Sequence, residues 1–134
     1  MHHRAVWDAV LPTLKGKVCD LGCGPCLIYK DKNIDLIGVD ISLQATIEAI
    51  KNYPQGEYVV APANDTGLPD KTFDTVVMFG LLDYFDNWDI VLREAERICK
   101  DDGHILATLL NGFAQHDWTS YKHITGNWHL YEHK

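Results

Sequence analysis

Two aspartates and a pair of glycines are the residues whose types and spacing indicate chemistry in this sequence. Asp20 ends an apolar segment and is followed by Gly22 and Gly24, and Asp40 ends a second apolar segment twenty residues later. Glycines in such a turn can adopt positive φ and let the main chain approach a small polar ligand. An acid about 20 residues further on has the spacing of a carboxylate that binds ribose hydroxyls. The pattern therefore predicts a nucleoside site at the ends of two neighbouring strands.

The same residues resemble a known family. Residues 20–25 read Asp-Leu-Gly-Cys-Gly-Pro and residues 38–40 read Gly-Val-Asp, and together they resemble motifs I and II of the class I S-adenosylmethionine-dependent methyltransferases. The resemblance implies S-adenosyl-L-methionine as the cofactor. It implies that Asp40 binds both ribose hydroxyls and that Ile41 packs on adenine. It also implies that the methionyl part is bound by the first acid and its loop: Asp20, Gly22, Cys23 and Gly24.

Residues 64–69 extend the resemblance to the base of the cofactor. They stand where the family reads the adenine edge, although an Asp-Ala pair is usual in place of Asn64 and Asp65. Either side chain can accept a hydrogen bond from the exocyclic amine, and Asp65 is slightly favoured. The alternative reading is a polar surface loop.

Residues 79–84 stand where the family places backbone groups near the methionine moiety and side chains near the methyl acceptor. The resemblance therefore implies cofactor contacts by Phe79 and Gly80. It makes Asp83 and Tyr84 the expected catalytic residues, while a solvent-facing Asp83 in the loop before the next helix is the alternative.

The implied reaction is methyl transfer to a small-molecule acceptor by in-line displacement. Residues 17–110 are similar in layout to the broad group called methyltransferase type 11. Because a sulfonium already activates the methyl carbon, the protein must mainly orient the reacting atoms. Four side chains are candidates for accepting a proton from the acceptor, by position alone: Asp83, Tyr84, His116 and His129.

Cys26 is a departure from the family pattern, because the family usually has a third glycine there. A thiol at this turn should cost little unless the backbone requires positive φ, in which case the left-handed conformation disfavours a side chain.

Size and composition place the chain among ordinary globular proteins. Its 134 residues predict one domain, residues 1–134, with an N-terminal capping helix in 1–16, a core in 17–110 and an aromatic, histidine-rich tail in 111–134. The net charge of −7 argues against nucleic acid as a partner. No signal peptide or membrane span is evident, so a cytoplasmic location is expected, with the four cysteines as free thiols and no metal site.

Apolar segments alternate with helical patterns along the chain. Strands are predicted at residues 17–21, 34–39, 57–60, 73–79 and 104–110, and helices at 42–52, where Ser42 is the N-cap, and at 88–100, closed by Asp102 and Gly103. A short turn is expected at 26–30. This alternation predicts an α/β fold with a doubly wound, Rossmann-like, mostly parallel sheet.

The tail raises a different expectation. The family normally continues with a helix and an antiparallel strand pair, and residues 111–134 show no pattern securely assigned to them, so the sheet is expected to lack that pair. The fifth strand would then be an open edge. We expect the aromatic tail to cover it, or two chains to form a homodimer there or through the tail.

Three other readings remain open. Cys19, Cys23 and Cys26 have the Cys-x3-Cys-x2-Cys spacing of a radical S-adenosylmethionine iron–sulfur site, although Cys19 falls inside a predicted strand. A nicotinamide dinucleotide site would need a third glycine where Leu27 stands. A catalytically weak or inactive cofactor-binding module that acts with a partner subunit is the third.

Overall fold

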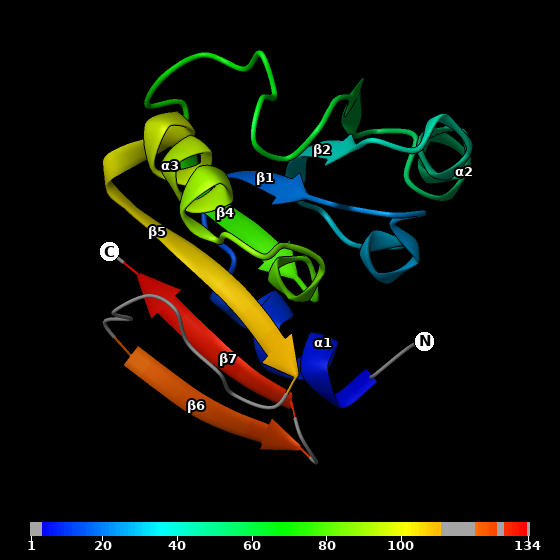
Figure 1. Ribbon diagram of the computed structural model, residues 1–134. Coiled ribbons are helices and arrows are strands. Elements are labelled where there is room, and N and C mark those ends of the chain that lie inside the picture. Colours follow the sequence, from blue (N-terminus) through cyan, green and yellow to red (C-terminus); the bar gives the residue numbers. More distant parts are fainter. Residues whose placement is uncertain (1–3, 111–119, 126–127, 134) are drawn as a thin grey trace.

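A computed structural model describes residues 4–110, 120–125 and 128–133 of the chain. Its centre is a seven-stranded sheet in the order β3-β2-β1-β4-β5-β7-β6 (Figure 1). The strands are β1 (Lys17–Leu21), β2 (Asp35–Asp40), β3 (Glu57–Val60), β4 (Phe73–Phe79), β5 (Cys99–Leu110), β6 (Ser120–Thr125) and β7 (Trp128–His133).

The first five strands run parallel, which confirms the predicted doubly wound α/β sheet. The strand order reverses between β1 and β4, since β2 and β3 lie on one side of β1 and β5 lies beyond β4. Ligands of such sheets bind beyond the carboxyl ends of the strands at this point. The topology therefore brings the end of β1, with its glycine loop, next to the ends of β2 and β4.

The prediction that the sheet lacks an antiparallel strand pair is wrong. β7 pairs antiparallel with β5, and β6 pairs antiparallel with β7. The sequence does contain a signal for this hairpin, because Gly126 and Asn127 separate two segments rich in aromatic and β-branched residues. The predicted open edge of β5 is thus covered by β7, from the tail as expected, and β5 cannot pair with a second chain along that edge.

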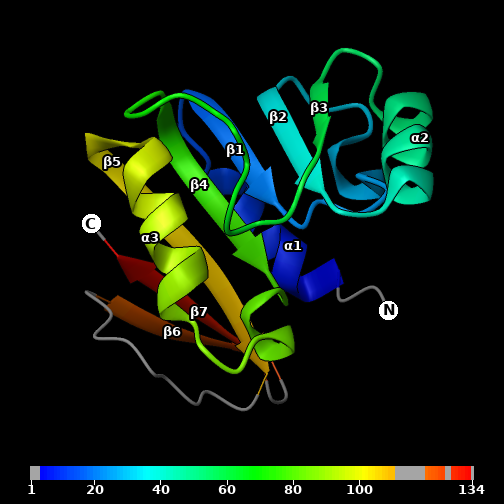
Figure 2. The same ribbon diagram turned by 45° about the horizontal axis from the view of Figure 1, so that its top comes forward.

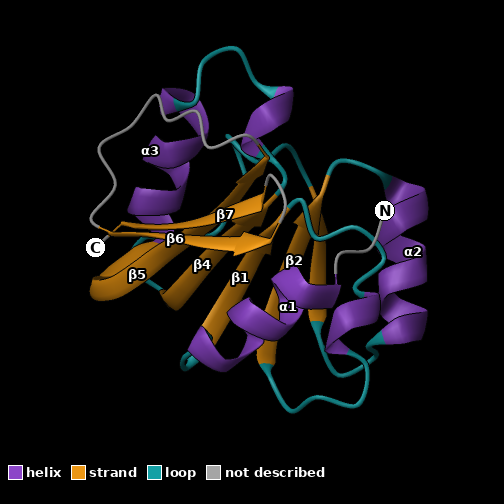
Figure 3. Ribbon diagram, turned by 90° about the horizontal axis from the view of Figure 1, so that it is seen from below, coloured by secondary structure: helices purple, strands orange, loops and turns teal. Residues whose placement is uncertain are grey.

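Two layers of helices cover the parallel strands, on opposite faces. On one face lies α3 (Asp89–Ile98), whose residues Val91, Leu92, Ala95 and Ile98 are buried in one core cluster. On the other lie α1 (Arg4–Val10) and α2 (Leu43–Asn52), with Val6, Val10 and Ala49 in a second cluster. Figures 2 and 3 show α3 and α1 on the two sides of the sheet.

The described residues also form three short 3₁₀ turns: η1 (Leu11–Thr13), η2 (Leu27–Tyr29) and η3 (Leu82–Tyr84). The predicted Ser42 cap of α2 is confirmed, since the Ser42 side chain accepts from the Ala45 N–H at 3.1 Å. None of the described helices is long and apolar enough to cross a membrane.

The predicted end of the last helix is wrong. α3 stops at Ile98, and Cys99 is already extended and begins β5, five residues earlier than predicted. Gly103 does not close a helix. A Cβ on it would lie 2.9 Å from the Asp74 carbonyl oxygen, so glycine is needed there because β4 and β5 approach closely beside a register shift.

Candidate functional site

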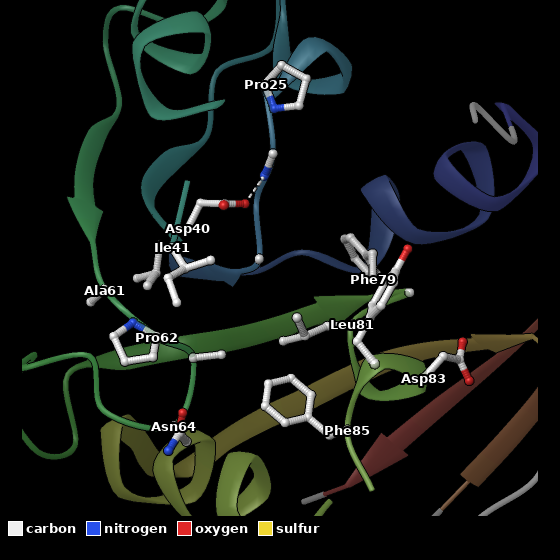
Figure 4. Close-up of a pocket in the computed structure, with 16 residues that line it drawn as sticks. Pro25, Asp40, Ile41, Ala61, Pro62, Asn64, Phe79, Leu81, Asp83 and Phe85 are labelled. Carbon is white, nitrogen blue, oxygen red and sulfur yellow. Dashed lines mark hydrogen bonds between the residues drawn. The ribbon is translucent and has the colours of Figure 1, made fainter. Parts of the chain in front are cut away.

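A cavity of about 1150 Å³ lies across the carboxyl ends of the parallel strands. Residues from the ends of four strands and the loops after them line it: Gly22, Gly24 and Pro25 after β1; Val39, Asp40 and Ile41 at the end of β2; Ala61, Pro62, Ala63 and Asn64 after β3; and Phe79, Gly80, Leu81, Asp83, Tyr84 and Phe85 at and after the end of β4 (Figure 4). This is the switch point at which the fold favours ligand binding.

Most of the predicted site residues meet at this cavity. Gly22, Gly24, Asp40, Ile41, Asn64, Phe79, Gly80, Asp83 and Tyr84 line it. Three predicted residues are absent from the wall: Asp20, Cys23 and Asp65. The lining residues that the sequence did not predict are mainly small or apolar, and no motif in the sequence marks them.

The glycine loop is fastened to β2 by its own backbone. The N–H groups of Gly22 and Cys23 both donate to the Val39 carbonyl, at 2.7 and 3.0 Å, and the Gly24 N–H donates to Asp40 Oδ2 at 2.9 Å. These three amides therefore hold the loop against the second strand instead of pointing at a ligand. What the glycines provide is room, because a Cβ on Gly24 would meet no atom within 4 Å.

Asp40 is fixed at the mouth of the cavity. Its Oδ2 accepts from Gly24 and its Oδ1 accepts from the Ser42 N–H at 2.9 Å. Each carboxylate oxygen retains a further lone pair, so both can still accept a hydroxyl hydrogen. Figure 4 shows the bond between this carboxylate and the loop. The carboxylate is thus held in place with both oxygens able to accept from a pair of neighbouring hydroxyl groups.

Asp20 lies beneath the loop and is 2% exposed. The Tyr29 hydroxyl donates to its Oδ2 at 2.6 Å, while its Oδ1 has no hydrogen-bond partner among the described residues. Burial raises the pKa of Asp20 to about 7, against the lowering effect of the Tyr29 hydrogen bond. A buried carboxylate oxygen without a partner is costly, and a cationic amine above the loop would satisfy it. This unsatisfied oxygen fits the methionine ammonium of the expected cofactor.

Cys26 adopts the backbone conformation that the family's glycine provides. Its φ is 58° and its ψ is 28°, in the left-handed region. The condition under which the thiol becomes unfavourable is therefore met, at a cost of about 1–2 kcal/mol relative to glycine. The side chain is buried in the cluster beneath α1 and α2, which offsets part of that cost.

The adenine side of the cavity is formed by Ile41 and by the loop after β3. Ile41 is 73% exposed, so a planar base could cover it at little steric cost. Asn64 lies on the wall, whereas Asp65 lies off it, with its N–H donating to the Pro62 carbonyl at 3.1 Å. The geometry thus favours Asn64 over the slightly preferred Asp65 as the residue that reaches a base.

A buried carboxylate from α3 holds this loop, and sequence reasoning did not single it out. Glu94 accepts from the N–H and the hydroxyl of Thr66, at 2.8 and 2.7 Å, and from Arg97 Nε and Nη2, at 2.7 and 2.9 Å. Hydrogen bonds from Arg97 and Thr66 lower the pKa of Glu94 to about 2, against burial. The i,i+3 pair of Glu94 and Arg97 is visible in the sequence, but its contact with Thr66 is not.

The side of the cavity formed by the end of β4 and the residues after it is aromatic. Phe79, Tyr84 and Phe85 line it, and Trp7 of α1 packs edge-on against Phe79 at a centroid distance of 4.4 Å. Asp83 and Tyr84 lie on η3, and Tyr84 is 87% exposed. Figure 4 shows Asp83 beyond Phe79 and Leu81, on the side away from Asp40.

The two histidine candidates are not tested by this geometry. His116 lies outside the described residues, and His129 is described by its backbone alone, as a β7 residue paired with Leu109 and with His123. The described side chains that line the cavity include two carboxylates, Asp40 and Asp83, and no lysine, arginine or histidine. The wall therefore favours a ligand that carries positive charge.

The three cysteines with iron–sulfur spacing do not lie on one side of the sheet. Cys19 is fully buried in the cluster that includes α3, and Cys26 is buried in the cluster on the opposite face. No group of metal-ligating side chains is found among the described residues. Leu27 begins η2, so the helix that a dinucleotide site places after its third glycine is here a single turn.

Comparison with known proteins matches residues 19–107 to a family described as a methyltransferase domain. Two curated relatives are similar over most of the chain. An uncharacterized protein, MJ1252, of Methanocaldococcus jannaschii is 37% identical over 70% of this chain, and a demethylmenaquinone methyltransferase of Thermotoga maritima is 29% identical over 77%. The matched stretch spans 37% and 47% of the length of these two relatives.

Solved structures share the fold. The PH0226 protein of Pyrococcus horikoshii has a TM-score of 0.78 at 18% identity, with 96% of this chain and 89% of that chain covered. A TehB-like S-adenosylmethionine-dependent methyltransferase of Corynebacterium glutamicum has a TM-score of 0.76 at 15% identity, with 96% and 84% covered. A possible histamine N-methyltransferase of Thermotoga maritima has a TM-score of 0.71 at 24% identity, with 81% and 51% covered.

Proposed function

This chain belongs to the class I S-adenosylmethionine-dependent methyltransferases, and we propose that it transfers a methyl group from that cofactor to a small-molecule acceptor. The observation that carries the proposal is the Asp40 carboxylate, which two backbone N–H groups hold at the mouth of a cavity built at the switch point of the sheet. Both of its oxygens retain acceptor capacity for ribose hydroxyls.

In this proposal three groups of the chain hold the cofactor. Asp40 binds the ribose, Ile41 and Asn64 contact the adenine, and the orphaned Oδ1 of Asp20 attracts the methionine ammonium from beneath the loop. Gly24 leaves the space beside it free of a side chain, whereas Gly22 makes room for Leu81, whose side chain a Cβ there would approach to 2.8 Å. Cys23 and Asp65 support the neighbouring backbone without contacting the ligand.

The bound cofactor supplies a methyl group already activated by a sulfonium. The chain contributes orientation, which in well-ordered systems is worth up to about 7–11 kcal/mol. The walls at Phe79, Leu81 and Phe85 exclude water and position an acceptor, and Asp83 or Tyr84 accepts the proton that the acceptor loses. Carboxylates at the wall also favour the positive charge of a sulfonium.

The acceptor class is open to direct screening. One curated relative is named for demethylmenaquinone, and one solved structure of the same fold is called a possible histamine N-methyltransferase. A panel should therefore contain quinols, phenols, amines that carry an aromatic ring, thiols and carboxylates. The aromatic side of the cavity supports acceptors with a planar apolar body.

Calorimetry with S-adenosylmethionine and S-adenosylhomocysteine tests the cofactor site. Asp40→Ala should abolish measurable binding, because it removes a charged partner of two hydroxyls at about 1.5–3 kcal/mol each. Asp35→Ala is the matched control, since Asp35 is an exposed acid at the opposite end of the same strand. Equal binding by both variants would contradict the site. Binding by the wild type without turnover across the acceptor panel would favour the inactive module over the enzyme.

A further inference from the structure

Cys23 and Cys26 form a thiol pair within the loop that the proposed function assigns to the cofactor. They are the ends of the tetrapeptide Cys23-Gly24-Pro25-Cys26, and the Cys-x-x-Cys spacing is that of reversible dithiol–disulfide pairs. The Cys26 thiol donates to the Cys23 carbonyl at 3.7 Å, and the Cys23 thiol donates to the Gly24 carbonyl at 3.4 Å. The neighbouring Cys26 thiol, together with burial, raises the pKa of Cys23.

The fold separates this pair from the other two cysteines. Cys19 and Cys99 are buried in the cluster on the α3 face of the sheet, whereas Cys23 and Cys26 pack with the cluster on the α1 and α2 face. An intramolecular disulfide can therefore form between Cys23 and Cys26 without crossing the sheet. Of the two, Cys23 is partly exposed and Cys26 is 2% exposed, so Cys23 is the thiol that an external reagent reaches first.

We propose that Cys23 and Cys26 are a redox site, which a low-molecular-weight disulfide such as oxidised glutathione converts into an intramolecular disulfide that weakens cofactor binding. The Cys23 thiolate attacks one glutathione sulfur, the glutathione disulfide breaks, and the first glutathione leaves as a thiolate that takes up a proton. Cys26 then attacks the Cys23 sulfur and displaces the glutathione attached there. Two cysteines lose two electrons and two protons, and two glutathione thiols are formed.

Gly24 connects this site to the ribose-binding acid. Its N–H, between the two cysteines, donates to Asp40 Oδ2 at 2.9 Å. A disulfide requires the two sulfurs to approach to about 2.05 Å, closer than any non-bonded contact. The intervening Gly24 and Pro25 must shift as the ring closes, and Asp40 loses one of the two donors that orient it. This consequence rests on the proposed function, whereas the disulfide itself does not.

The chemistry of the loop predicts slow exchange. Thiol–disulfide exchange requires the thiolate, and the neighbouring Cys26 thiol and burial raise the pKa of Cys23, which keeps the thiolate scarce near neutral pH. Oxidation should accordingly accelerate as the pH rises. It should also be faster without S-adenosylhomocysteine than with it, because the ligand would hold the loop in its reduced form.

The test combines intact mass, peptide mapping and calorimetry on the full chain incubated with oxidised glutathione. The wild type should lose the mass of two hydrogens without retaining glutathione, and its affinity for S-adenosylhomocysteine should fall about tenfold or more, which corresponds to about 1.4 kcal/mol. Dithiothreitol should restore both. Cys23→Ser should not react, and Cys26→Gly should stop at one glutathione adduct on Cys23, with its backbone relieved of the left-handed side chain.

Three outcomes would overturn the proposal: no reaction of the wild type, a stable glutathione adduct without ring closure, or a disulfide that leaves the affinity unchanged. If the disulfide forms but neither the oxidised nor the reduced protein binds the ligand, the coupling to cofactor binding is refuted. In that case the mass result separates the failure of the proposed function from the existence of the redox site.

Discussion

The two walls of the cavity are held by different kinds of contact. The wall after β1 and β2 is fastened by the N–H groups of Gly22, Cys23 and Gly24. They donate to the last two residues of β2, which follow the glycine loop closely in the chain. The wall at residues 61–64 belongs to a loop without helix or strand, and Glu94 of α3 fixes it through Thr66. The first wall is built by backbone hydrogen bonds. The second has one such bond to β2, from the Ala61 N–H to the Asp40 carbonyl at 3.1 Å, and relies further along on one buried side chain.

The two walls should therefore tolerate different substitutions. Backbone bonds at the first wall survive most side-chain substitutions, so only changes that alter φ or the Asp40 carboxylate should damage it. Two of the four hydrogen bonds on the Glu94 carboxylate come from Thr66, so a single substitution should release the loop around Thr66.

Removing Glu94 should have the largest effect. Glu94→Ala leaves the Thr66 N–H and the Arg97 guanidinium without their main acceptor and should cost about 3 kcal/mol of unfolding free energy. Denaturant titration measures this, and calorimetry should show weaker S-adenosylhomocysteine binding. Glu48→Ala, at an exposed acid of α2, is the control. Equal losses in the two variants would mean that Glu94 does not hold the loop.

The same carboxylate predicts a pH dependence. The pKa of Glu94 is lowered to about 2 from an ordinary value of 4.5, so its contribution to stability is present above pH 4.5 and is lost as the pH falls towards 2. Stability measured from pH 6 down to 2 should drop across this window in the wild type. Glu94→Gln should flatten this part of the profile, and an unchanged slope would contradict the assignment.

The Asp20 carboxyl should make stability change with pH in the opposite direction. Its pKa is raised to about 7 from 3.8, so the unfolded chain releases its proton first and stability decreases between pH 4 and 7. Asp20→Asn should therefore stabilise the protein at pH 8 by a few kcal/mol at most, with no gain at pH 3.5. Melting temperatures at the two pH values measure this. Binding of the cofactor should weaken, because the ammonium loses its counter-charge.

Gly24→Ala tests the role of the glycine loop in the first wall. Gly24 and Gly67 both have positive φ, 58° and 73°, and a Cβ at either position meets no atom within 4 Å. Each alanine substitution should cost about 1–2 kcal/mol of stability for the left-handed backbone. Of the two, only Gly24→Ala should weaken S-adenosylhomocysteine binding, because Gly24 donates to Asp40 and Gly67 does not. Similar binding losses in both variants would contradict a local role for the loop.

The smallest effect is expected at β7, the strand that pairs with β5. Glu132 of β7 lies 2.7 Å from His104 Nδ1, and His104 Nε2 lies 3.1 Å from the Thr75 hydroxyl, so β7, β5 and β4 are linked. Glu132→Gln should cost about 1 kcal/mol. Hydrogen exchange should quicken at the amides of β7 and leave β1 unchanged. Protection that falls equally in both strands would indicate global destabilisation instead.

The sequence determined the parallel core and the first wall. Apolar segments bounded by turns located β1, β3 and β4 to the residue, and the Gly-x-Gly turn with Asp40 was recognisable because its chemistry depends on residues close together in the chain. The family resemblance rests on the same local pattern. Most of the predicted site residues line the cavity for this reason.

Only the tertiary structure decided the rest. The burial of Asp20, the contact of Glu94 with Thr66 and the displacement of Asp65 from the wall depend on which elements pack together. The β6–β7 pair was missed although a Gly-Asn hairpin signal was present, because strand pairing is fixed by the partner edge that β5 offers. Contacts between residues distant in the chain are set by packing and desolvation, and no local pattern of residue types encodes them.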